Sequence, residues 1–244
     1  MASLDVRDIH VWYRKVEAVR GISLSVADRE CVGIVGSNGA GKTSLLRAIS
    51  SLVPHTGSVA VDGKVVRGSS DQVVRSGITH VLEGRHIFCE MSVRENLQLA
   101  KFAKNDSTFN ERLSDVLETF PILKPKLRSR GGDLSGGQQQ ILALARGLLT
   151  APGVLLLDEP SLGLAPVVVE QLAGAIPIIK DHYKTTVLLA EQAISLVVAV
   201  ADRLCVIARG EVKYDGPPTA NVLRTEVLRG YFGESPQSEP ERTD

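Results

Sequence analysis

The chain has 244 residues, and its 28 lysines and arginines balance 28 aspartates and glutamates, so the formal net charge is zero. This balance argues against a nucleic-acid-binding protein, because such proteins usually carry a basic excess. With 43% hydrophobic and 23% charged residues, the composition excludes a disordered, collagen-like or small disulfide-rich chain. We expect Cys31, Cys89 and Cys205, an odd number spread along the chain, to be reduced core residues.

The sequence predicts neither a secretory signal in its first residues nor a membrane-spanning helix. The first ten residues include Asp5, Arg7 and Asp8, which interrupt the apolar run that a secretory signal needs. The longest nearly apolar run, residues 194–201, is far shorter than the roughly 18 residues of a membrane-spanning helix. Residues 234–244 are predicted to be a disordered tail, so we expect one folded domain over residues 1–233.

The first part of the chain has the composition of antiparallel strands. Residues 4–30 and 58–66 are rich in β-forming residues, and Asp62-Gly63 predicts a hairpin turn between two strands. These stretches therefore predict an N-terminal antiparallel β subdomain.

The remainder alternates between short apolar runs and helical patterns. The apolar runs are continuous, which is typical of strands buried on both faces, and they comprise residues 31–35, 78–82, 154–157, 186–190 and 204–208. The helical patterns comprise residues 42–52, 92–102, 108–120, 135–149, 165–181 and 194–200. This alternation predicts an α/β core with a mostly parallel sheet. Because residues 92–149 contain only helix and loop, we expect them to form a helical subdomain inserted into that core.

A glycine-rich loop follows the strand expected at residues 31–35. Its residues GSNGAGKT match the phosphate-binding pattern GxxxxGK[ST] in the required order of strand, loop and helix. Backbone N–H groups and the helix N-terminus would face the phosphates, Lys42 would reach the β and γ oxygens, and Thr43 would hold Mg²⁺. A glycine-rich turn with a solvated lysine is the alternative. The predicted nucleotide-binding residues are Gly36, Ser37, Asn38, Gly39, Ala40, Gly41, Lys42, Thr43 and Ser44.

The strand expected at residues 154–157 ends in Asp158 and Glu159. Open α/β folds bind ligands at the carboxyl ends of their strands. We therefore expect Asp158 to hold Mg²⁺ and Glu159 to polarise the attacking water as a general base. A solvated turn after an apolar strand is the alternative explanation of these two carboxylates.

The segment LSGGQ at residues 134–138 begins the helix that precedes this strand. Ser135 and Gln138 have the spacing of a capping box. Gly136 and Gly137 leave the first N–H groups of the helix uncovered, which predicts a second anion-binding helix end. A capped helix start without a ligand is the alternative.

The sequence carries three motifs in this order: GSNGAGKT at residue 36, LSGGQ at residue 134 and LLLDEP at residue 155. Together they resemble the ATP-binding subunit of ABC transporters, over residues 4–233. LSGGQ is the specific element, because other phosphate-loop ATPases and GTPases lack it. The resemblance implies ATP and Mg²⁺ as cofactors and a head-to-tail dimer, in which the LSGGQ helix of one subunit closes on the γ-phosphate held by the other. It also implies that Tyr13 stacks on adenine, with a core aromatic as the alternative.

Three positions depart from the usual pattern of this family. Glu83 aligns with the usual glutamine, Gln192 with the usual switch histidine, and Ala165 with the usual loop aspartate. The alignment implies that Glu83 contacts Mg²⁺ or its water and that Gln192 donates to the γ-phosphate. Because glutamine does not titrate near neutral pH as histidine does, we expect Glu159 to carry more of the base role.

The departures are similar to the second ATPase subunit of branched-chain amino acid importers, although Leu82 and Arg14 replace the usual proline and glycine. This resemblance implies a peripheral ATPase on the cytoplasmic face of the membrane, which drives import through separate permease subunits. Its other partners would be a second ATPase subunit, either a paralogue or a second copy, and an extracytoplasmic binding protein. A urea or amide importer, a lipid exporter and a non-transport ABC ATPase are the alternatives.

Other polar segments have simpler explanations. Residues 80–86 contain two histidines and Glu83, but a strand followed by a loop does not align them on one helical face, so Mg²⁺ is the only metal predicted. The basic residues between 101 and 130 predict a solvated face, with contact to a permease loop as the alternative. Arg85, Phe88 and Met91 favour a docking groove.

Overall fold

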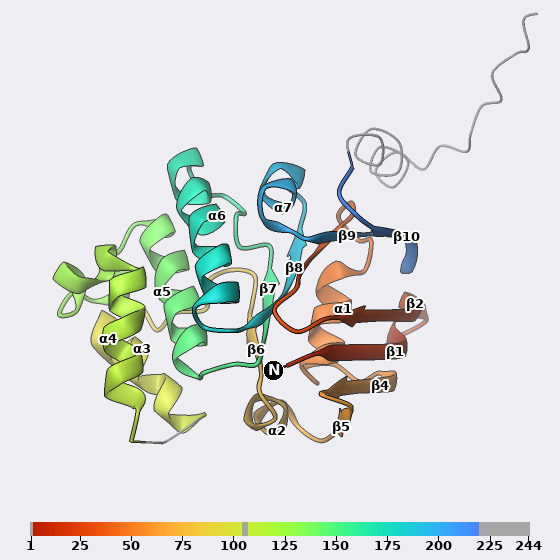
Figure 1. Cartoon of the computed structure of the whole chain (residues 1–244), viewed down its shortest axis with the longest axis horizontal. Coiled ribbons are helices and arrows are strands. Elements are labelled where there is room, and N and C mark those ends of the chain that lie inside the picture. Colours follow the sequence, from red (N-terminus) through yellow and green to blue (C-terminus); the bar gives the residue numbers. More distant parts are fainter. Residues whose placement is uncertain (1, 104–106, 220–244) are drawn as a thin grey trace, which may run out of the picture.

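The computed structural model describes residues 2–103 and 107–219, which form two sheets and a group of helices (Figure 1). Within these residues, one sheet is four-stranded with the order β2-β1-β4-β5, and the other is six-stranded with the order β10-β9-β3-β8-β7-β6. The strands are β1 (Leu4–Tyr13), β2 (Val16–Val26), β3 (Cys31–Val35), β4 (Thr56–Val61), β5 (Lys64–Val66), β6 (Ile78–Val81), β7 (Val154–Asp158), β8 (Thr186–Glu191), β9 (Arg203–Ala208) and β10 (Glu211–Gly216). The four-stranded sheet is antiparallel, and β10 is the antiparallel edge of the otherwise parallel larger sheet.

The helices occupy the intervals between the strands of the larger sheet. They are α1 (Lys42–Ile49), α2 (Ser70–Arg75), α3 (Val93–Gln98), α4 (Phe109–Thr119), α5 (Gly136–Leu149), α6 (Pro166–Asp181) and α7 (Ile194–Val200), with 3₁₀ turns η1 (Leu99–Phe102), η2 (Pro121–Lys126) and η3 (Gly131–Asp133). The segment from α3 to α5 lies between β6 and β7 and forms the helical group beside the sheet (Figure 1). The predicted α/β architecture, with its antiparallel β subdomain and helical insertion, is therefore confirmed. The predicted tail at residues 234–244 lies outside the described residues.

Alternate residues of the parallel strands contribute to two separate hydrophobic cores. Val32 and Ile34 of β3 face α1 and the antiparallel sheet, together with Leu156 and Leu188 of the neighbouring strands. Leu155 and the other residues on the opposite face pack with α5, α6 and α7. All five residues of β3 are buried, which explains why the strand has a continuous apolar sequence instead of an alternating one.

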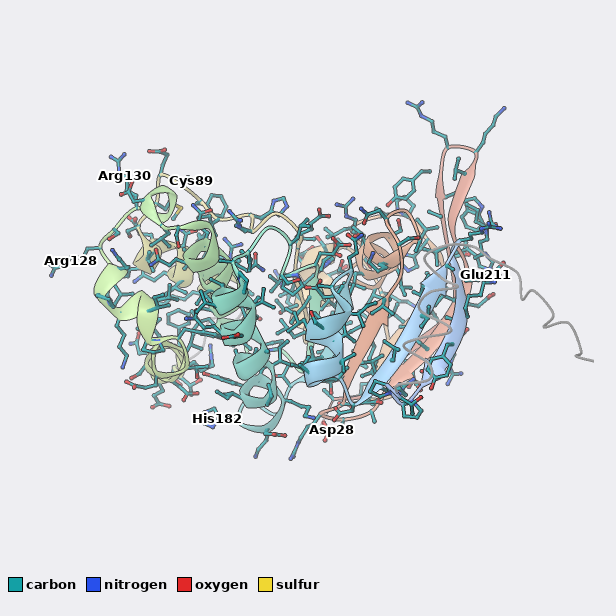
Figure 2. All side chains as sticks on the ribbon, turned by 90° about the horizontal axis from the view of Figure 1, so that it is seen from above. Asp28, Cys89, Arg128, Arg130, His182 and Glu211 are labelled. Carbon is teal, nitrogen blue, oxygen red and sulfur yellow. The ribbon has the colours of Figure 1, made fainter. Side chains whose placement is uncertain are left out.

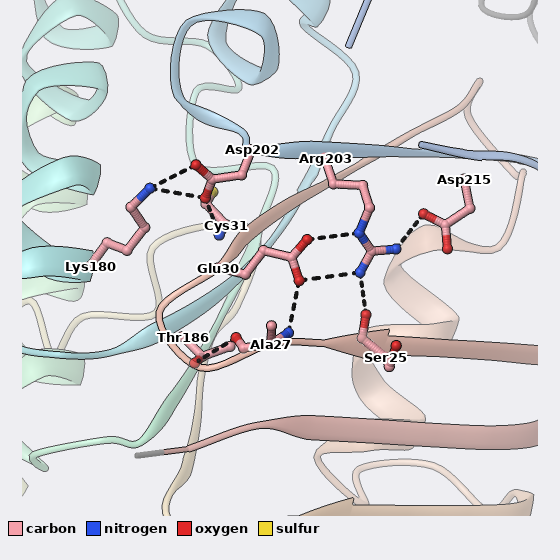
Figure 3. A network of polar contacts seen from close by, with 9 residues as sticks. All are labelled: Ser25, Ala27, Glu30, Cys31, Lys180, Thr186, Asp202, Arg203 and Asp215. Carbon is pink, nitrogen blue, oxygen red and sulfur yellow. Dashed lines mark hydrogen bonds and ion pairs between the residues drawn. The ribbon is translucent and has the colours of Figure 1, made fainter. Parts of the chain in front are cut away.

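A polar network fixes the end of the antiparallel sheet to the last hairpin (Figure 3). Arg203 Nε donates to Glu30 Oε1 over 2.7 Å, and the same guanidinium also contacts Asp215 of β10 and the carbonyl of Ser25 in β2. These partners raise the pKa of Arg203 above its ordinary value, the hydrogen bond to Glu30 contributing most. Lys180 of α6 contacts Asp202 through both carboxylate oxygens at 2.9 Å. The network therefore connects three regions that are far apart in the sequence.

Two of the cysteines lie where the sequence predicts, and the third does not. Cys31 and Cys205 are buried, whereas Cys89 is exposed. Cys89 belongs to the loop between β6 and α3, and its carbonyl accepts a hydrogen bond from Gly132 N–H at 2.9 Å. Figure 2 shows Cys89 at the surface, at the same edge as Arg130.

Four basic residues of the helical subdomain, Lys124, Lys126, Arg128 and Arg130, are exposed, and Figure 2 shows Arg128 and Arg130 at the surface. Two of them meet acidic neighbours, because Lys124 contacts Glu118 and Arg130 lies 3.4 Å from Glu90. Ion pairs of this exposed kind contribute little to stability. Within residues 2–103 and 107–219, no helix combines the length and the apolar character that crossing a membrane requires.

Candidate phosphate-binding site

Most of the predicted site residues meet at the carboxyl ends of the parallel strands of the larger sheet. The glycine-rich loop follows β3, Glu83 follows β6, Asp158 ends β7, and Glu191 and Gln192 lie at the end of β8. Because these strands are parallel, their carboxyl ends lie side by side. Residues up to 156 positions apart in the sequence, from Gly36 to Gln192, thereby come to the same sheet edge.

The loop delivers an uncapped helix N-terminus to this edge. Gly41 is the residue before the first turn of α1, its φ is 111°, and α1 has neither a side-chain cap nor an acidic residue in its first turn. A Cβ atom at Gly41 would also lie 2.6 Å from the carbonyl oxygen of Ala18. The first N–H groups of α1 are therefore open to an anion, and only glycine fits the turn that presents them.

Lys42 lies almost completely buried beneath the loop. Its Nζ donates to the carbonyl of Gly36 at 2.9 Å and lies 3.4 Å from the carbonyl of Ser37. The same Nζ lies 3.1 Å from Glu159 Oε1, and the side chains of the two residues are only 4% and 9% exposed. The lysine predicted to bind phosphate thus pairs with the carboxylate predicted to act as the base.

Thr43 and Asp158 form a pair of hard oxygen donors, because Thr43 Oγ1 donates to Asp158 Oδ1 at 3.0 Å. Burial raises the pKa of Asp158 to about 6, and the negative charges of Glu83 and Glu159 add to this effect, while the hydrogen bond from Thr43 opposes it. The other carboxylate oxygen, Oδ2, is buried and has no hydrogen-bond partner among the described residues. The carboxylates of Asp158 and Glu83 and the hydroxyl of Thr43 are oxygen donors of the kind that Mg²⁺ prefers, so these residues fit this ion.

His80 lies beside Asp158 in the structure, a neighbour that no sequence motif indicates. Its Nε2 is 3.9 Å from Asp158 Oδ2, and its Nδ1 is 2.9 Å from Ser50 Oγ. Burial lowers the pKa of His80 to about 3, so the imidazole is neutral at physiological pH. The apolar run at residues 78–82 predicts His80 in a strand, which is confirmed, but it does not specify the neighbouring strand.

Glu159 has a backbone conformation that is unusual for a residue with a side chain. Its φ is 45°, in the left-handed region. Its N–H donates to the carbonyl of Ala190 in β8 at 2.8 Å, and a turn follows in which Leu162 N–H donates to the carbonyl of Glu159 at 3.1 Å. Such strain persists only where surrounding contacts hold the residue, and it is concentrated at functional sites.

A cavity of about 410 Å³ joins these elements. It is lined by Tyr13, Glu83, Glu159 and Gln192 together with most of the glycine-rich loop, from Asn38 to Ser44. Gly36 and Ser37, the first two residues of the loop, do not line the cavity, and their carbonyls face Lys42. Tyr13 is 43% exposed at the mouth of the cavity. The cavity therefore combines phosphate-binding groups with an accessible aromatic ring.

The second predicted helix end lies outside this cavity. Ser135, Gly136, Gly137 and Gln138 begin α5, and Ser135 and Gln138 form the expected capping box. Arg85 crosses this end and donates to Gln139 Oε1 at 3.3 Å, and a Cβ atom at Gly136 would lie 2.8 Å from its guanidinium. The N-terminus of α5 therefore lies outside the cavity that the N-terminus of α1 borders.

A separate groove of about 500 Å³ lies between the sheet and the helical subdomain. Arg85 and Phe88 line it, as expected, together with Val74 of α2 and Arg146 of α5. Arg146 donates to the carbonyl of His86 at 2.7 Å and holds the loop that carries Phe88. Met91 lines a different hollow, with Phe102. Two of the three residues from which a docking groove was predicted therefore line this groove, and its docking role stays a prediction.

Comparisons with known proteins agree with this geometry. The sequence model of a family described as ABC transporter matches residues 19–162. The high-affinity branched-chain amino acid transport ATP-binding protein BraG of Pseudomonas aeruginosa is 35% identical, and the match covers 92% of this chain and 97% of BraG. The probable branched-chain amino acid transport ATP-binding protein LivF of Archaeoglobus fulgidus is 29% identical over 88% of this chain and 91% of its own length. A crystal structure of an ATP-binding cassette of an ABC transporter, in its ADP conformation, superposes with a TM-score of 0.84 at 26% identity, covering 96% of this chain and 100% of that one.

Proposed function

Because this chain belongs to the ABC transporter family and carries its ATPase fold, we propose that it hydrolyses ATP to drive a branched-chain amino acid importer. ATP hydrolysis is supported above all by one observation: at the carboxyl ends of the parallel strands, Lys42 contacts Glu159 and Thr43 contacts Asp158. The whole-length similarity to BraG, together with Glu83, Ala165 and Gln192, supports the importer class.

In the proposed mechanism, the N–H groups at the start of α1 and the Lys42 ammonium hold the ATP phosphates. Phosphate oxygens then replace Glu159 as the partner of Lys42, which frees the carboxylate to accept a proton from the attacking water. Gln192, which also lines the cavity, donates to the γ-phosphate. ATP binding would therefore also activate the base, because the phosphates that bind Lys42 release Glu159 from it.

Thr43, Asp158 and Glu83 are the residues that would hold Mg²⁺ directly or through its water. The ion would neutralise charge on the β and γ phosphates. The buried Asp158 Oδ2, which has no hydrogen-bond partner among the described residues, is an acceptor that such a cation would satisfy.

Tyr13 is proposed to stack on adenine, and replacing it by alanine is expected to weaken ATP binding about 5- to 150-fold. This range corresponds to the ~1–3 kcal/mol typical of stacking between a base and an aromatic ring. The neighbouring Trp12 provides a matched control, because it stacks on His10 with ring centroids 5.3 Å apart and does not line the cavity. Titration calorimetry with a non-hydrolysable ATP analogue should show weakened binding for Tyr13→Ala and unchanged binding for Trp12→Ala. Equal affinities for all three proteins would make Tyr13 a structural aromatic.

The helix end at Ser135 to Gln138 is proposed to act on the nucleotide of a second ATPase subunit, since it lies outside the cavity of its own chain. This arrangement requires a head-to-tail dimer, with two nucleotides at the interface. The second subunit is a paralogue or another copy of this chain. In either case, each catalytic site would be completed by the partner.

The groove between the sheet and the helical subdomain is proposed to receive a cytoplasmic loop of the permease. Its residues Arg85 and Phe88 belong to the same loop as Glu83, which lines the phosphate cavity. Movement of this loop on ATP binding would therefore reach the docked permease. The protein would act at the cytoplasmic face of the membrane as a peripheral subunit, with an extracytoplasmic binding protein supplying the amino acid.

Uptake measurements test the substrate class. In cells that lack this chain, the initial rate of labelled leucine uptake is expected to fall, and wild-type protein should restore it while Glu159→Gln should not. Labelled urea serves as the competing substrate. A loss of urea uptake with normal leucine uptake would assign the chain to the urea or amide branch, and a loss of neither would exclude both import classes.

A further inference from the structure

A buried carboxylate that no step above uses lies directly behind the catalytic residues. Glu191 is the last residue of β8 and is 1% exposed. Burial raises its pKa, and this effect is opposed by hydrogen bonds from Ser161 and from the backbone of Ala193. A buried carboxylate without a charged partner is costly, so its presence at this position needs an explanation.

Each oxygen of Glu191 holds a different loop. Oε1 accepts a hydrogen bond from Ser161 N–H at 2.8 Å, two residues after Glu159. Oε2 accepts one from Ala193 N–H at 3.4 Å, one residue after Gln192. Glu191 thus connects the backbone that follows the proposed base to the backbone that follows the proposed γ-phosphate donor.

The Glu159 loop needs this support. Glu159 has a strained φ of 45°, and its N–H is held by the carbonyl of Ala190, the residue before Glu191. The end of β8 therefore holds the loop at two points, through the carbonyl of Ala190 and the carboxylate of Glu191. Glu191, Glu159 and Gln192 also line one hollow of about 340 Å³, so the three residues are contiguous.

We propose that Glu191 is a positioning residue that sets the separation between Glu159 and Gln192 across the γ-phosphate. This inference rests on the roles proposed above for those two residues. Glu191 lies outside the cavity that contains the phosphate loop, so it acts on the chemical step through the two loops and not on ATP itself. A displacement of about 1 Å in a catalytic group can cost about 100-fold in rate.

Two substitutions remove the support in steps. Glu191→Ala deletes both acceptors and is expected to lower kcat about 100-fold, with the KM for ATP changed less than about threefold. Glu191→Gln keeps one acceptor oxygen and places an NH₂ group against the other N–H donor, so we expect an intermediate loss of about 10-fold. Glu170→Ala, which removes an exposed carboxylate on α6, is the matched control and should leave both constants unchanged.

The experiment measures kcat, the KM for ATP, ATP affinity and the thermal midpoint for these variants, for Glu159→Gln and for the double variant E159Q/E191A. A positioning role predicts a graded fall in kcat alone, and little further loss when Glu191→Ala is added to Glu159→Gln. Wild-type kcat in both Glu191 variants would overturn the proposal, as would a matching loss of ATP affinity or failure of both variants to fold. Near-normal turnover in Glu159→Gln would instead contradict the proposed base, so the two failures are distinguishable.

Discussion

Replacing Glu159 by glutamine is expected to lower the maximal rate of ATP hydrolysis by about 100- to 10,000-fold while leaving ATP binding intact. Glutamine has nearly the same shape and keeps an oxygen acceptor, so the strained turn at residues 159–162 can persist. It cannot take a proton from water. The substitution also removes the negative charge that pairs with Lys42, 3.1 Å away in the wild-type protein, so ATP affinity should stay equal or rise.

Phosphate release and ATP affinity, measured on the same preparations, check this prediction. Glu170→Gln is a matched control, because it makes the same chemical change at an exposed position of α6. In the assembled transporter, or in this chain if it forms a homodimer, Glu159→Gln should also accumulate an ATP-bound dimer, since closure occurs and hydrolysis does not. Near-normal turnover would exclude Glu159 as the base.

Replacing Lys42 by alanine should weaken ATP binding about 10- to 100-fold, as expected for the loss of a charge-assisted hydrogen bond to phosphate. The substitution has a second consequence, because it leaves the nearly buried Glu159 without its ion pair. We therefore expect the free energy of unfolding to fall as well. Lys64→Ala, an exposed lysine on β5, should change neither quantity.

The double variant K42A/E159Q separates the two effects. Replacing the unpaired carboxylate with an amide should recover part of the lost stability, while ATP binding should stay weak. Urea unfolding and equilibrium nucleotide binding measure the two quantities independently. If Glu159→Gln restored ATP binding to Lys42→Ala, the phosphate role of Lys42 would be wrong and its only task would be to neutralise Glu159.

The sequence predicted those features that local patterns determine. The glycine-rich loop could be placed because a strand, a turn and a helix follow one another within a few residues, and the continuous apolar runs identified the buried parallel strands. The short α2 and β10 were not predicted, because their sequences, SDQVVR and EVKYDG, contain no continuous apolar run of the kind that identified the core strands. Cys89 was wrongly expected in the core, because apolar neighbours in sequence do not fix the direction of a side chain in a loop.

The contacts that complete the candidate site could not be read from the sequence. Lys42 meets Glu159, and His80 approaches Asp158, only because the strands that carry them align in one sheet. Glu191 looked like the ordinary end of a buried strand, and its two backbone donors come from loops on either side of it. Such contacts depend on strand order and register, neither of which a single sequence specifies.

The strand order also governs when this site can form during synthesis. β3, which carries the glycine-rich loop, has β8 and β9 as its two neighbours, and both are made more than 150 residues later. The earliest part of the binding site must therefore wait, with its apolar strand unpaired, until almost the whole described chain has left the ribosome. Such long-range pairing makes folding slow and exposes the nascent chain to aggregation, so this architecture places a demand on chaperones.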